Sequence, residues 1–322
     1  MAQGEKIDVH HHMVPEFYSK TLKSRGVDAA AGAPLPHWTP DVSLAVMDAT
    51  GISKAYLSIS CPGVFFGDAV EAKELARRCN EYGNELKGGS ERFGYFATIS
   101  QTIEEDAVAE TIHAIDNLGA DGVTLLSSVD GVYLGHSDYW PLMDELNRRK
   151  SVVFVHPNLP DSTKNIRLEM PGYLMEFVFD TTRAVSNLIA SGTMERFPDI
   201  KFILAHAGGT VPYLAWRLQL GDFVLDKDGK FPKGTMYYIK QFYYDTALSP
   251  SPYMWGAVKE LVGADRLLFG SDFPFAPDLL VHAEVNDLAN LGMTKAEHQA
   301  LYFGTATELF SSVDPRKCDA AE

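Results

Sequence analysis

Lys6-Ile7-Asp8-Val9-His10-His11-His12 opens this chain as a short apolar strand that runs directly into three consecutive histidines. Side chains alternate between the two faces of a strand, so His10 and His12 point the same way. Two imidazoles that project together from the end of a strand can hold one metal ion. His11 points to the other face, where it packs or supports its neighbours. A purification tag or a solvated histidine cluster is the alternative, and the apolar residues on both sides of the run argue against it.

Apolar runs of the same kind recur along the whole chain, separated by amphipathic stretches. We predict strands over Ile7–His10, Ala55–Ser60, Gly94–Thr98, Gly122–Leu126, Val152–His156, Phe202–His206, Phe242–Asp245 and Leu267–Asp272. We predict helices over Asp41–Thr50, Ala69–Leu86, Glu104–Leu118, Trp140–Arg148, Phe179–Arg196, Pro212–Leu220 and Pro252–Leu261. This alternation predicts an α/β fold, a (β/α)8 TIM barrel with loop insertions over its C-terminal face. A doubly wound open sheet is the alternative, but no glycine-rich GxGxxG turn is present.

Two long loops and one helix boundary refine this prediction. Thr39-Pro40-Asp41 has the cap and first-turn proline of a helix start, and Gly51 follows the last helical residue as a stop. The segment from Ser24 to Trp38 is predicted to be a loop insertion after the first strand, in which Trp38 either caps a pocket or anchors a surface loop. The segment from Pro157 to Gly172 follows the fifth strand and can act as a lid.

Length and composition restrict the class of protein. The chain of 322 residues is 46% hydrophobic, which predicts a soluble globular enzyme with one domain over residues 1–322. A net charge of −15 argues against a nucleic-acid partner, because phosphate binding requires a basic patch. The three cysteines form no CxxC pattern, which is typical of reduced thiols in the cytoplasm. No signal-peptide h-region and no stretch of ~18 apolar residues is present, so we expect neither secretion nor a membrane partner.

Titratable side chains stand where four predicted strands end. His156 follows Val152-Val153-Phe154-Val155, His206 follows a run that ends at Ala205, and Asp272 follows Gly270-Ser271. A titratable group at the end of a buried strand is costly unless it has a function or a partner. Because all these ends meet on one face of a barrel, we expect the three to lie beside His10 and His12. Asp245, after Phe242-Tyr243-Tyr244, either supports them or caps a helix through Thr246, and we favour the structural role.

The predicted cluster has the composition of a metal site. Imidazoles and a carboxylate suit Zn²⁺ and also Mn²⁺, Fe²⁺ or Co²⁺. A catalytic site keeps one coordination position open for water or substrate. Five candidate groups exceed what one zinc ion usually takes from a protein, so one of them is expected to do acid–base work.

Four motifs in order resemble the amidohydrolase superfamily, and more closely its branch of aminocarboxymuconate-semialdehyde and ortho-hydroxybenzoate decarboxylases. They are His10-His11-His12 after strand one, His156 after strand five, His206-Ala207-Gly208-Gly209 after strand six and Gly270-Ser271-Asp272-Phe273-Pro274 after strand eight. Within the branch the chain is similar to the group that contains fungal 6-methylsalicylate decarboxylases. That similarity rests on Trp38-Thr39-Pro40, Ser60-Cys61-Pro62-Gly63-Val64, Phe93-Gly94-Tyr95-Phe96-Ala97 and Phe179-Asp180-Thr181-Thr182-Arg183-Ala184.

The resemblance implies a role for each motif residue. His10, His12, His156 and Asp272 match the metal ligands of the family, and His206 matches its unligated catalytic histidine. Many superfamily members carry a carboxylated lysine on strand four, but Gly122–Leu126 has none, which argues for a single metal ion. We expect Zn²⁺, with Mn²⁺ as the alternative. The resemblance also implies a homodimer.

The expected function is metal-dependent, non-oxidative decarboxylation of an aromatic 2-hydroxycarboxylic acid such as 6-methylsalicylate. Asp272 or His206 would deliver the proton to the ring carbon. A metal-dependent hydrolase of a lactone, ester or amide is the alternative, and a protein that only binds is the third hypothesis. The candidate substrate-binding residues stand in suitable loops, and each has core packing or a surface salt bridge as its alternative role: Trp38, Phe66, Phe179, Phe275 and Arg183.

Overall fold

Eight parallel strands form the centre of the molecule. The computed structural model describes residues 5–225 and 228–312, so the predicted polar tail from Asp314 to Glu322 lies outside the described residues. The strands are β1 (Lys6–His12), β4 (Ile52–Ser58), β5 (Phe93–Thr98), β6 (Gly122–Leu126), β9 (Val152–His156), β10 (Lys201–Leu204), β11 (Tyr243–Asp245) and β12 (Leu267–Leu268). They pair in that order. Val9 donates its amide hydrogen to the carbonyl of Phe269 at 3.0 Å, so the last strand returns to the first and the sheet closes into a barrel.

All eight predicted strands are therefore confirmed, and β12 is shorter than predicted. After Leu268 the chain leaves regular pairing and bonds to the end of β1 instead, with the amides of Ser271 and Asp272 both donating to the carbonyl of His10. A left-handed φ of 56° at Asp272 bends the backbone at this point. The bend turns the Asp272 side chain over the end of the barrel.

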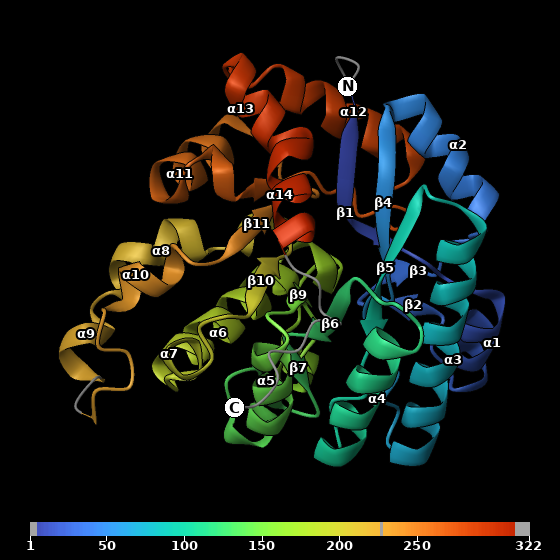
Figure 1. The fold of residues 1–322 in the computed structure, drawn as a ribbon, viewed down its shortest axis with the longest axis horizontal. Helices are drawn as coiled ribbons and strands as arrows, with labels where there is room; N and C mark the ends of the chain where they lie inside the picture. Colours follow the sequence, from blue (N-terminus) through green and yellow to red (C-terminus); the bar gives the residue numbers. More distant parts are fainter. Residues whose placement is uncertain (1–4, 226–227, 313–322) are drawn as a thin grey trace.

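Helices surround the barrel, as Figure 1 shows. The predicted helices are present as α2 (Pro40–Thr50), α3 (Ala69–Gly89), α4 (Glu104–Asp116), α5 (Trp140–Arg148), α6 (Glu176–Ala190), α8 (Val211–Leu218) and α11 (Pro252–Val262). The prediction of one helix over Phe179–Arg196 is wrong, because Gly192 in the left-handed region separates α6 from α7 (Thr193–Arg196). Sequence patterns also missed α1 (Glu16–Ser24), α9 (Gly221–Val224), α10 (Thr235–Ile239), α12 (Asp278–Ala289), α13 (Lys295–Gln299) and α14 (Thr305–Ser312).

The start and end of α2 follow the prediction. The Thr39 hydroxyl accepts the amide hydrogen of Val42 at 3.3 Å, and Gly51 ends the helix with a φ of 73°. These contacts satisfy polar groups that a helix leaves unpaired at its two ends. The cap thus fixes where the chain turns from the first loop insertion into α2.

The amino-terminal end of the barrel is filled by side chains and closed by α14. Val9, Tyr56, Phe96 and Phe154 pack together inside the barrel with Leu309 of this helix. The ring of Phe310, also from α14, stacks on Tyr56 with 3.9 Å between ring centroids. A packed interior of this kind is typical of (β/α)8 barrels and leaves the carboxyl ends of the strands for a site.

The two predicted loop insertions meet over the carboxyl ends of the strands. The first contains a short hairpin of β2 (Ala29–Ala30) and β3 (Ala33–Pro34). The amide of Tyr173, which follows the second insertion, donates to the carbonyl of Ala31 at 3.2 Å. The second insertion, which the sequence suggested as a lid, therefore rests against the first. Within the described ranges, no helix has both the length and the apolar character needed to cross a bilayer.

Candidate metal centre

The two histidines that share a face of β1 meet at their ring nitrogens. The Nε2 atoms of His10 and His12 are 3.0 Å apart, and both side chains are fully buried. On the far side of each ring, Nδ1 contacts another residue: Asp245 at 2.7 Å for His10 and the Ser58 hydroxyl at 2.9 Å for His12. The alternation of a strand and these two outer contacts therefore aim both Nε2 atoms at one point.

The ends of β9, β10 and β12 bring three more groups to the same point. The His156 ring centroid lies 5.3 Å from that of His10, and its Nδ1 contacts the carbonyl of Pro157 at 2.8 Å. Asp272 Oδ1 lies 3.0 Å from Nε2 of His12. One donor atom each from His10, His156, His206 and Asp272 lies within 4.8 Å of all the others. All five residues named from the sequence are therefore together in space.

The donor atoms suit a metal ion. The Pro157 carbonyl and the Asp245 carboxylate accept hydrogen bonds, so His156 and His10 each carry a hydrogen on Nδ1. In the neutral form of each ring, Nε2 then turns its lone pair toward the cluster. Lone pairs that face one another in a buried space repel unless a cation lies between them. Metal-binding histidines characteristically give their outer N–H to a carboxylate or carbonyl in this way. The arrangement fits one divalent metal ion held by imidazoles and a carboxylate.

Electrostatics within the cluster favour the ligand forms of three residues, the neutral rings of His12 and His156 and the ionised carboxylate of Asp272. Burial lowers the pKa of His12, and burial together with the neighbouring histidines puts the pKa of His156 well below its usual range, so both rings stay neutral. Burial alone would keep Asp272 protonated, but the charge on His10 and hydrogen bonds from the histidines hold its pKa well below its usual range. For His10, burial is outweighed by Asp245 and Asp272, which raise its pKa to about 10. The centre thus attracts positive charge.

Two buried carboxylates outside the cluster hold its backbone in place. Asp245 Oδ1 accepts the amide hydrogen of His206 at 2.8 Å, while its Oδ2 contacts His10. Asp8 accepts the amide hydrogens of His10 at 3.0 Å and Ser271 at 3.1 Å. Asp8 also contacts His11 Nδ1 at 2.9 Å, which explains why His11 points away from the cluster. These bonds fasten β1 to the ends of β10 and β12.

His206 differs from the other histidines of the cluster in its backbone conformation and in the surroundings of its Nδ1 atom. It and Ala207 both have left-handed φ values, of 54° and 55°, which are costly for residues other than glycine. Gly209 lets this turn pack tightly, because a Cβ there would collide with the backbone of Val178. The Nδ1 atom of His206 is buried and has no hydrogen-bond partner in the described part of the chain. An unsatisfied ring nitrogen beside the donor cluster is available to a substrate.

A cavity of about 590 Å³ opens from the cluster toward the surface. His156, His206 and Asp272 form its floor, and Ala30 and Pro34 of the first insertion contribute to its wall. The other residues that line it are Ala33, Ser60, Tyr173, Leu174, Phe177, Val178, Leu248, Ser249, Pro250, Phe275, Pro277, Leu280, Ala283, Glu284 and Asp287. Its size is that of a small-molecule site.

Two aromatic rings of the cavity wall lie against the histidines. Phe275 makes an edge contact with the His12 ring at 5.6 Å between centroids. Phe177 stacks on His206 at 6.3 Å with 21° between the planes, and it meets His156 edge-on at 5.7 Å. A flat ring that enters this cavity would therefore meet an aromatic wall on its way to the cluster.

Among the predicted substrate-binding residues, Phe275 lies in this wall, whereas the others lie elsewhere in the described part of the chain. Trp38 does not line the cavity: its Nε1 donates to the Ser43 hydroxyl at 2.8 Å and its ring packs in the core. Phe66 packs against the core, and Arg183 is an exposed residue of α6 beside Asp180. In the described residues, none of these three nor Phe179 lines the cavity.

Sequence patterns missed Phe177, Asp180 and Glu284. Phe177 stands two residues before the predicted Phe179 on α6, and only the pitch of the helix decides which of them faces the cavity. Asp180 is fully buried and accepts from the Tyr133 hydroxyl at 2.6 Å and the Asn158 amide at 2.9 Å, which holds the loop after His156. Its place in Phe179-Asp180-Thr181-Thr182-Arg183 was the available signal, whereas Glu284 had none because α12 was not predicted.

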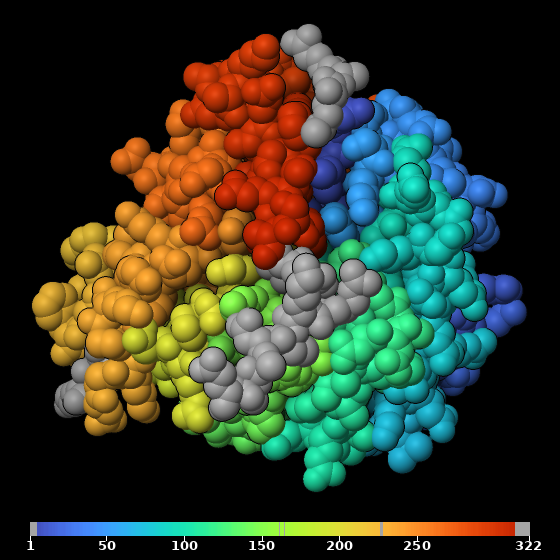
Figure 2. Space-filling view, in the orientation of Figure 1, coloured from blue at the N-terminus to red at the C-terminus, as the bar shows by residue number. Residues whose placement is uncertain are grey.

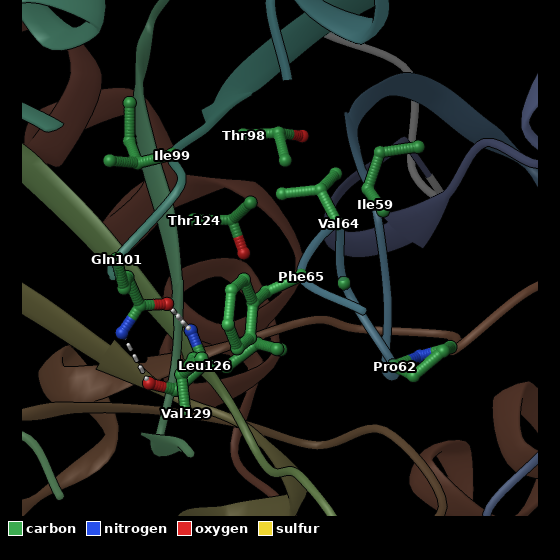
Figure 3. A pocket seen from close by; sticks show the side chains of 11 residues that line it. Ile59, Pro62, Val64, Phe65, Thr98, Ile99, Gln101, Thr124, Leu126 and Val129 are labelled. Atoms are coloured by element: carbon green, nitrogen blue, oxygen red, sulfur yellow. Dashed lines mark hydrogen bonds between the residues drawn. The ribbon is translucent and has the colours of Figure 1, made fainter. Parts of the chain in front are cut away.

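A second, much smaller cavity lies to the side of the barrel mouth. Figure 3 shows it between Ile59, Val64, Thr98 and Leu126, and its volume is about 20 Å³. The Gln101 side chain closes one edge through hydrogen bonds to both backbone groups of Leu126, at 2.7 Å and 3.1 Å. This space is sufficient for about one water molecule. The larger cavity is therefore the candidate substrate site.

Comparison with known proteins identifies the family. The family model described as amidohydrolase matches residues 7–311, and the chain belongs to this family. The chain is 36% identical to a decarboxylase named macB from Penicillium terrestre, over 95% of this chain and 94% of that protein. It is 33% identical to a 6-methylsalicylic acid decarboxylase from Penicillium expansum, over 95% of this chain and 96% of that protein. A crystal structure described as an amidohydrolase is 31% identical and superposes with a TM-score of 0.88, covering 95% of this chain and 99% of the other.

Proposed function

We propose that this protein is a metal-dependent decarboxylase of an aromatic 2-hydroxycarboxylic acid such as 6-methylsalicylate. The observation that carries the proposal is the buried cluster of histidines and one carboxylate, which opens into a cavity with aromatic walls. Relatives of 33% and 36% identity that are named decarboxylases support it. The family match over residues 7–311 supports a single catalytic domain over residues 1–322.

Four side chains would hold one divalent metal ion: His10, His12, His156 and Asp272. Zinc is the proposed ion, because three imidazoles and a carboxylate leave an open position, and manganese is the alternative. When bound, the metal supplies Lewis-acid binding of the substrate's ortho-hydroxyl and of one carboxylate oxygen. The absence of lysine from β6 supports a single ion.

Decarboxylation requires a proton at the ring carbon that bears the carboxylate. The new C–H bond breaks aromaticity, and cleavage of the C–C bond then releases CO₂ and returns the electron pair to the ring. Asp272 is the proposed donor and His206 the alternative, since both form the floor of the cavity. Asp272 is ionised before the substrate binds, so it would first take up the proton of the ortho-hydroxyl and then pass that proton to the ring carbon. In the first case, His206 uses its free Nδ1 to hold the phenolate or orient the ring.

The cavity wall would position the ring. Phe177 and Phe275 present aromatic surfaces beside the histidines, and a flat substrate fits between such surfaces. The wall would also exclude water from the ring carbon while the proton is transferred. Phe275 thus remains a proposed substrate-binding residue, and Phe177 joins it.

Hydrolysis of a lactone, ester or amide is the second candidate function. The unpartnered Nδ1 of His206 favours it, because a histidine beside a metal site can act as the base that activates water. The two candidates differ in what occupies the open position. For decarboxylation the metal would supply binding of a chelating substrate, and for hydrolysis it would supply activation of water.

A homodimer is part of the proposal. Large apolar side chains of α8 and α9 are exposed, with Tyr213 at 88%, Trp216 at 73% and Phe223 at 82%. These helices protrude at the left of the molecule in Figures 1 and 2. Exposed aromatic groups of this number mark an interaction surface, and a second copy of the chain is the proposed occupant. The aromatic pairs Phe231-Pro232 and Tyr237-Tyr238 are further candidates from the sequence for such an interface; Phe231 and Tyr238 are buried within the chain, whereas Tyr237 is 44% exposed.

The free thiols of the buried cysteines support a proposed cytoplasmic location. Cys61 and Cys79 are both free and buried. Free thiols are usual in reducing compartments, where disulfides are rare. Their burial also raises the pKa of the Cys61 thiol to about 12, which keeps it in the unreactive neutral form.

The test combines metal analysis with a product assay. The purified protein is analysed by mass spectrometry for bound metal and is then incubated with 6-methylsalicylate, while CO₂ and m-cresol are followed. Asp272→Asn and His206→Ala are assayed beside it, and both are expected to lose product formation. Bound metal without CO₂ from this or other 2-hydroxybenzoates would instead favour hydrolysis, to be assayed with lactones and esters.

A further inference from the structure

Glu284 is a buried acid in the wall of the large cavity. It lies on α12 with 2% of its surface exposed, and it lines the cavity together with Leu280 and Asp287 of the same helix. The proposed reaction assigns no role to it. Acidic side chains are almost never buried without a partner, so its position requires an explanation.

Within the described residues, only one of its two carboxyl oxygens has a hydrogen-bond partner. Oε1 accepts the amide hydrogen of Leu248 at 2.6 Å. Oε2 is buried and has no hydrogen-bond partner within residues 5–225 and 228–312. The bond to Leu248 explains how Glu284 holds the loop after β11, but that role needs one oxygen only. A buried oxygen without a hydrogen-bond partner destabilises the fold unless something binds to it.

The surroundings favour the neutral acid. Burial, and then the carboxylates Asp272 and Asp8, raise the pKa of Glu284 to about 9. Because Oε1 accepts the Leu248 hydrogen bond, the acid hydrogen sits on Oε2. The cavity wall therefore carries one unpaired O–H donor, beside apolar neighbours such as Leu280.

We propose that Glu284 is a specificity-determining residue that donates a hydrogen bond to a further oxygen on the substrate ring, a hydroxyl, methoxy or carbonyl oxygen, besides the ortho-hydroxyl and the carboxylate. The inference rests on the proposed function in taking this cavity as the substrate site. It predicts that, among 2-hydroxybenzoic acids, those that carry such an oxygen bind more tightly than 6-methylsalicylate, which lacks one and is therefore the weaker substrate. A site built to pair with a polar group discriminates strongly against analogues that lack it, because its own donor is then left unpaired.

The test measures binding and does not depend on turnover. The metal-loaded protein is titrated by calorimetry with 2-nitrophenol and with its hydroxylated derivatives, one for each free ring position. The planar nitro group takes the place of the carboxylate and is not released as CO₂. We expect at least one hydroxylated derivative to bind roughly 5–10-fold more tightly than the parent compound, the value of one hydrogen bond.

Two variants distinguish recognition of the ligand by Glu284 from the support that Glu284 gives to the loop after β11. Glu284→Gln keeps a donor and an acceptor and should keep the preference, whereas Glu284→Met should bind all the nitrophenols with the affinity of the parent. If Glu284→Met does not fold, Glu284→Asp, which withdraws the carboxyl by one methylene, replaces it and should lose the preference as well. A wild type without any preference, a Met variant that keeps it, or an equal loss for every compound would overturn the inference. Absence of CO₂ release from all 2-hydroxybenzoates would refute the decarboxylase alone and would leave this binding test valid.

Discussion

Nδ1 of His10 lies 2.7 Å from Oδ2 of Asp245, and both side chains are completely buried. The other oxygen of Asp245 accepts the backbone hydrogen of His206 at 2.8 Å. One carboxylate therefore sets the direction of a proposed metal ligand and the backbone of the proposed catalytic histidine. The position of Asp245 at the end of β11 makes this double contact possible.

Replacing Asp245 should weaken the metal site without removing a ligand. In Asp245→Asn the His10 ring loses its charged acceptor, and we expect the metal affinity to fall roughly 10–100-fold. Competition with a chromophoric chelator measures this affinity. Asp265→Asn, at an exposed aspartate just before β12 and thus at the opposite end of that strand from Asp272, is the control and should bind metal normally. Equal affinities for the two variants would show that Asp245 does not support the site.

Replacing His156 and replacing His206 should change the metal content of the protein differently. His156→Ala removes a proposed ligand and should give protein with little bound metal. His206→Ala should keep its metal and reduce CO₂ release by roughly 10²–10⁴-fold, the usual range for an acid–base group. Metal analysis of both purified variants, followed by the product assay, decides between these roles. Loss of metal from His206→Ala would identify His206 as a metal ligand.

Phe177 and Phe179, two residues apart on α6, provide a test position and its control. Phe177 lines the cavity and stacks on His206, whereas Phe179 does not line it. Phe177→Ala should raise the KM for the aromatic acid roughly tenfold, since an aromatic contact contributes about 0.5–1.5 kcal/mol. Phe179→Ala should leave the KM unchanged. Steady-state kinetics of both variants make the comparison, and a larger change in Phe179→Ala would contradict the proposed cavity wall.

Glu284 should make the stability of the fold depend on pH. Its pKa rises from an ordinary 4.5 to about 9 in the folded chain, through burial and the facing carboxylates Asp272 and Asp8, partly opposed by His10. Between these two pH values the folded chain holds a proton that the unfolded chain has released, so this residue destabilises the fold increasingly as pH rises. At pH values below 4.5, Glu284 is protonated in both the folded and the unfolded chain, so its effect on stability disappears.

Glu284→Gln should therefore stabilise the protein at pH 8, by on the order of 2 kcal/mol, and have little effect at pH 4.5. Urea denaturation at both pH values measures the difference. Asp287→Asn, at an exposed carboxyl of the same helix, is the control and should change stability at neither pH. A gain that is the same at both pH values would mean that Glu284 is ionised in the folded chain.

The barrel and its cluster could be predicted because their signals are local. A strand such as Val152–His156 is apolar until its last residue, and the geometry of a barrel then brings such last residues together. The pair His10 and His12 follows from alternation along β1. No side chain outside these strand ends was needed to locate the cluster.

The cavity wall could not be predicted because it depends on contacts between distant residues. Trp38 is directed into the core by the Ser43 hydroxyl, and a loop sequence does not show this contact. Asp8 binds Ser271, which is 263 residues away in the chain. Phe177 rather than Phe179 faces the cavity because of where α6 begins, and helix boundaries are poorly defined by sequence patterns.

The most direct test of a single catalytic metal ion is a titration of the metal-free protein. Zn²⁺ or Mn²⁺ is added in steps, and the initial rate of CO₂ release from 6-methylsalicylate is measured after each addition. We expect the rate to rise linearly until one ion per chain is bound and then to stay constant. A rate that needs a second ion, or CO₂ release from protein shown to hold no metal, would contradict this expectation.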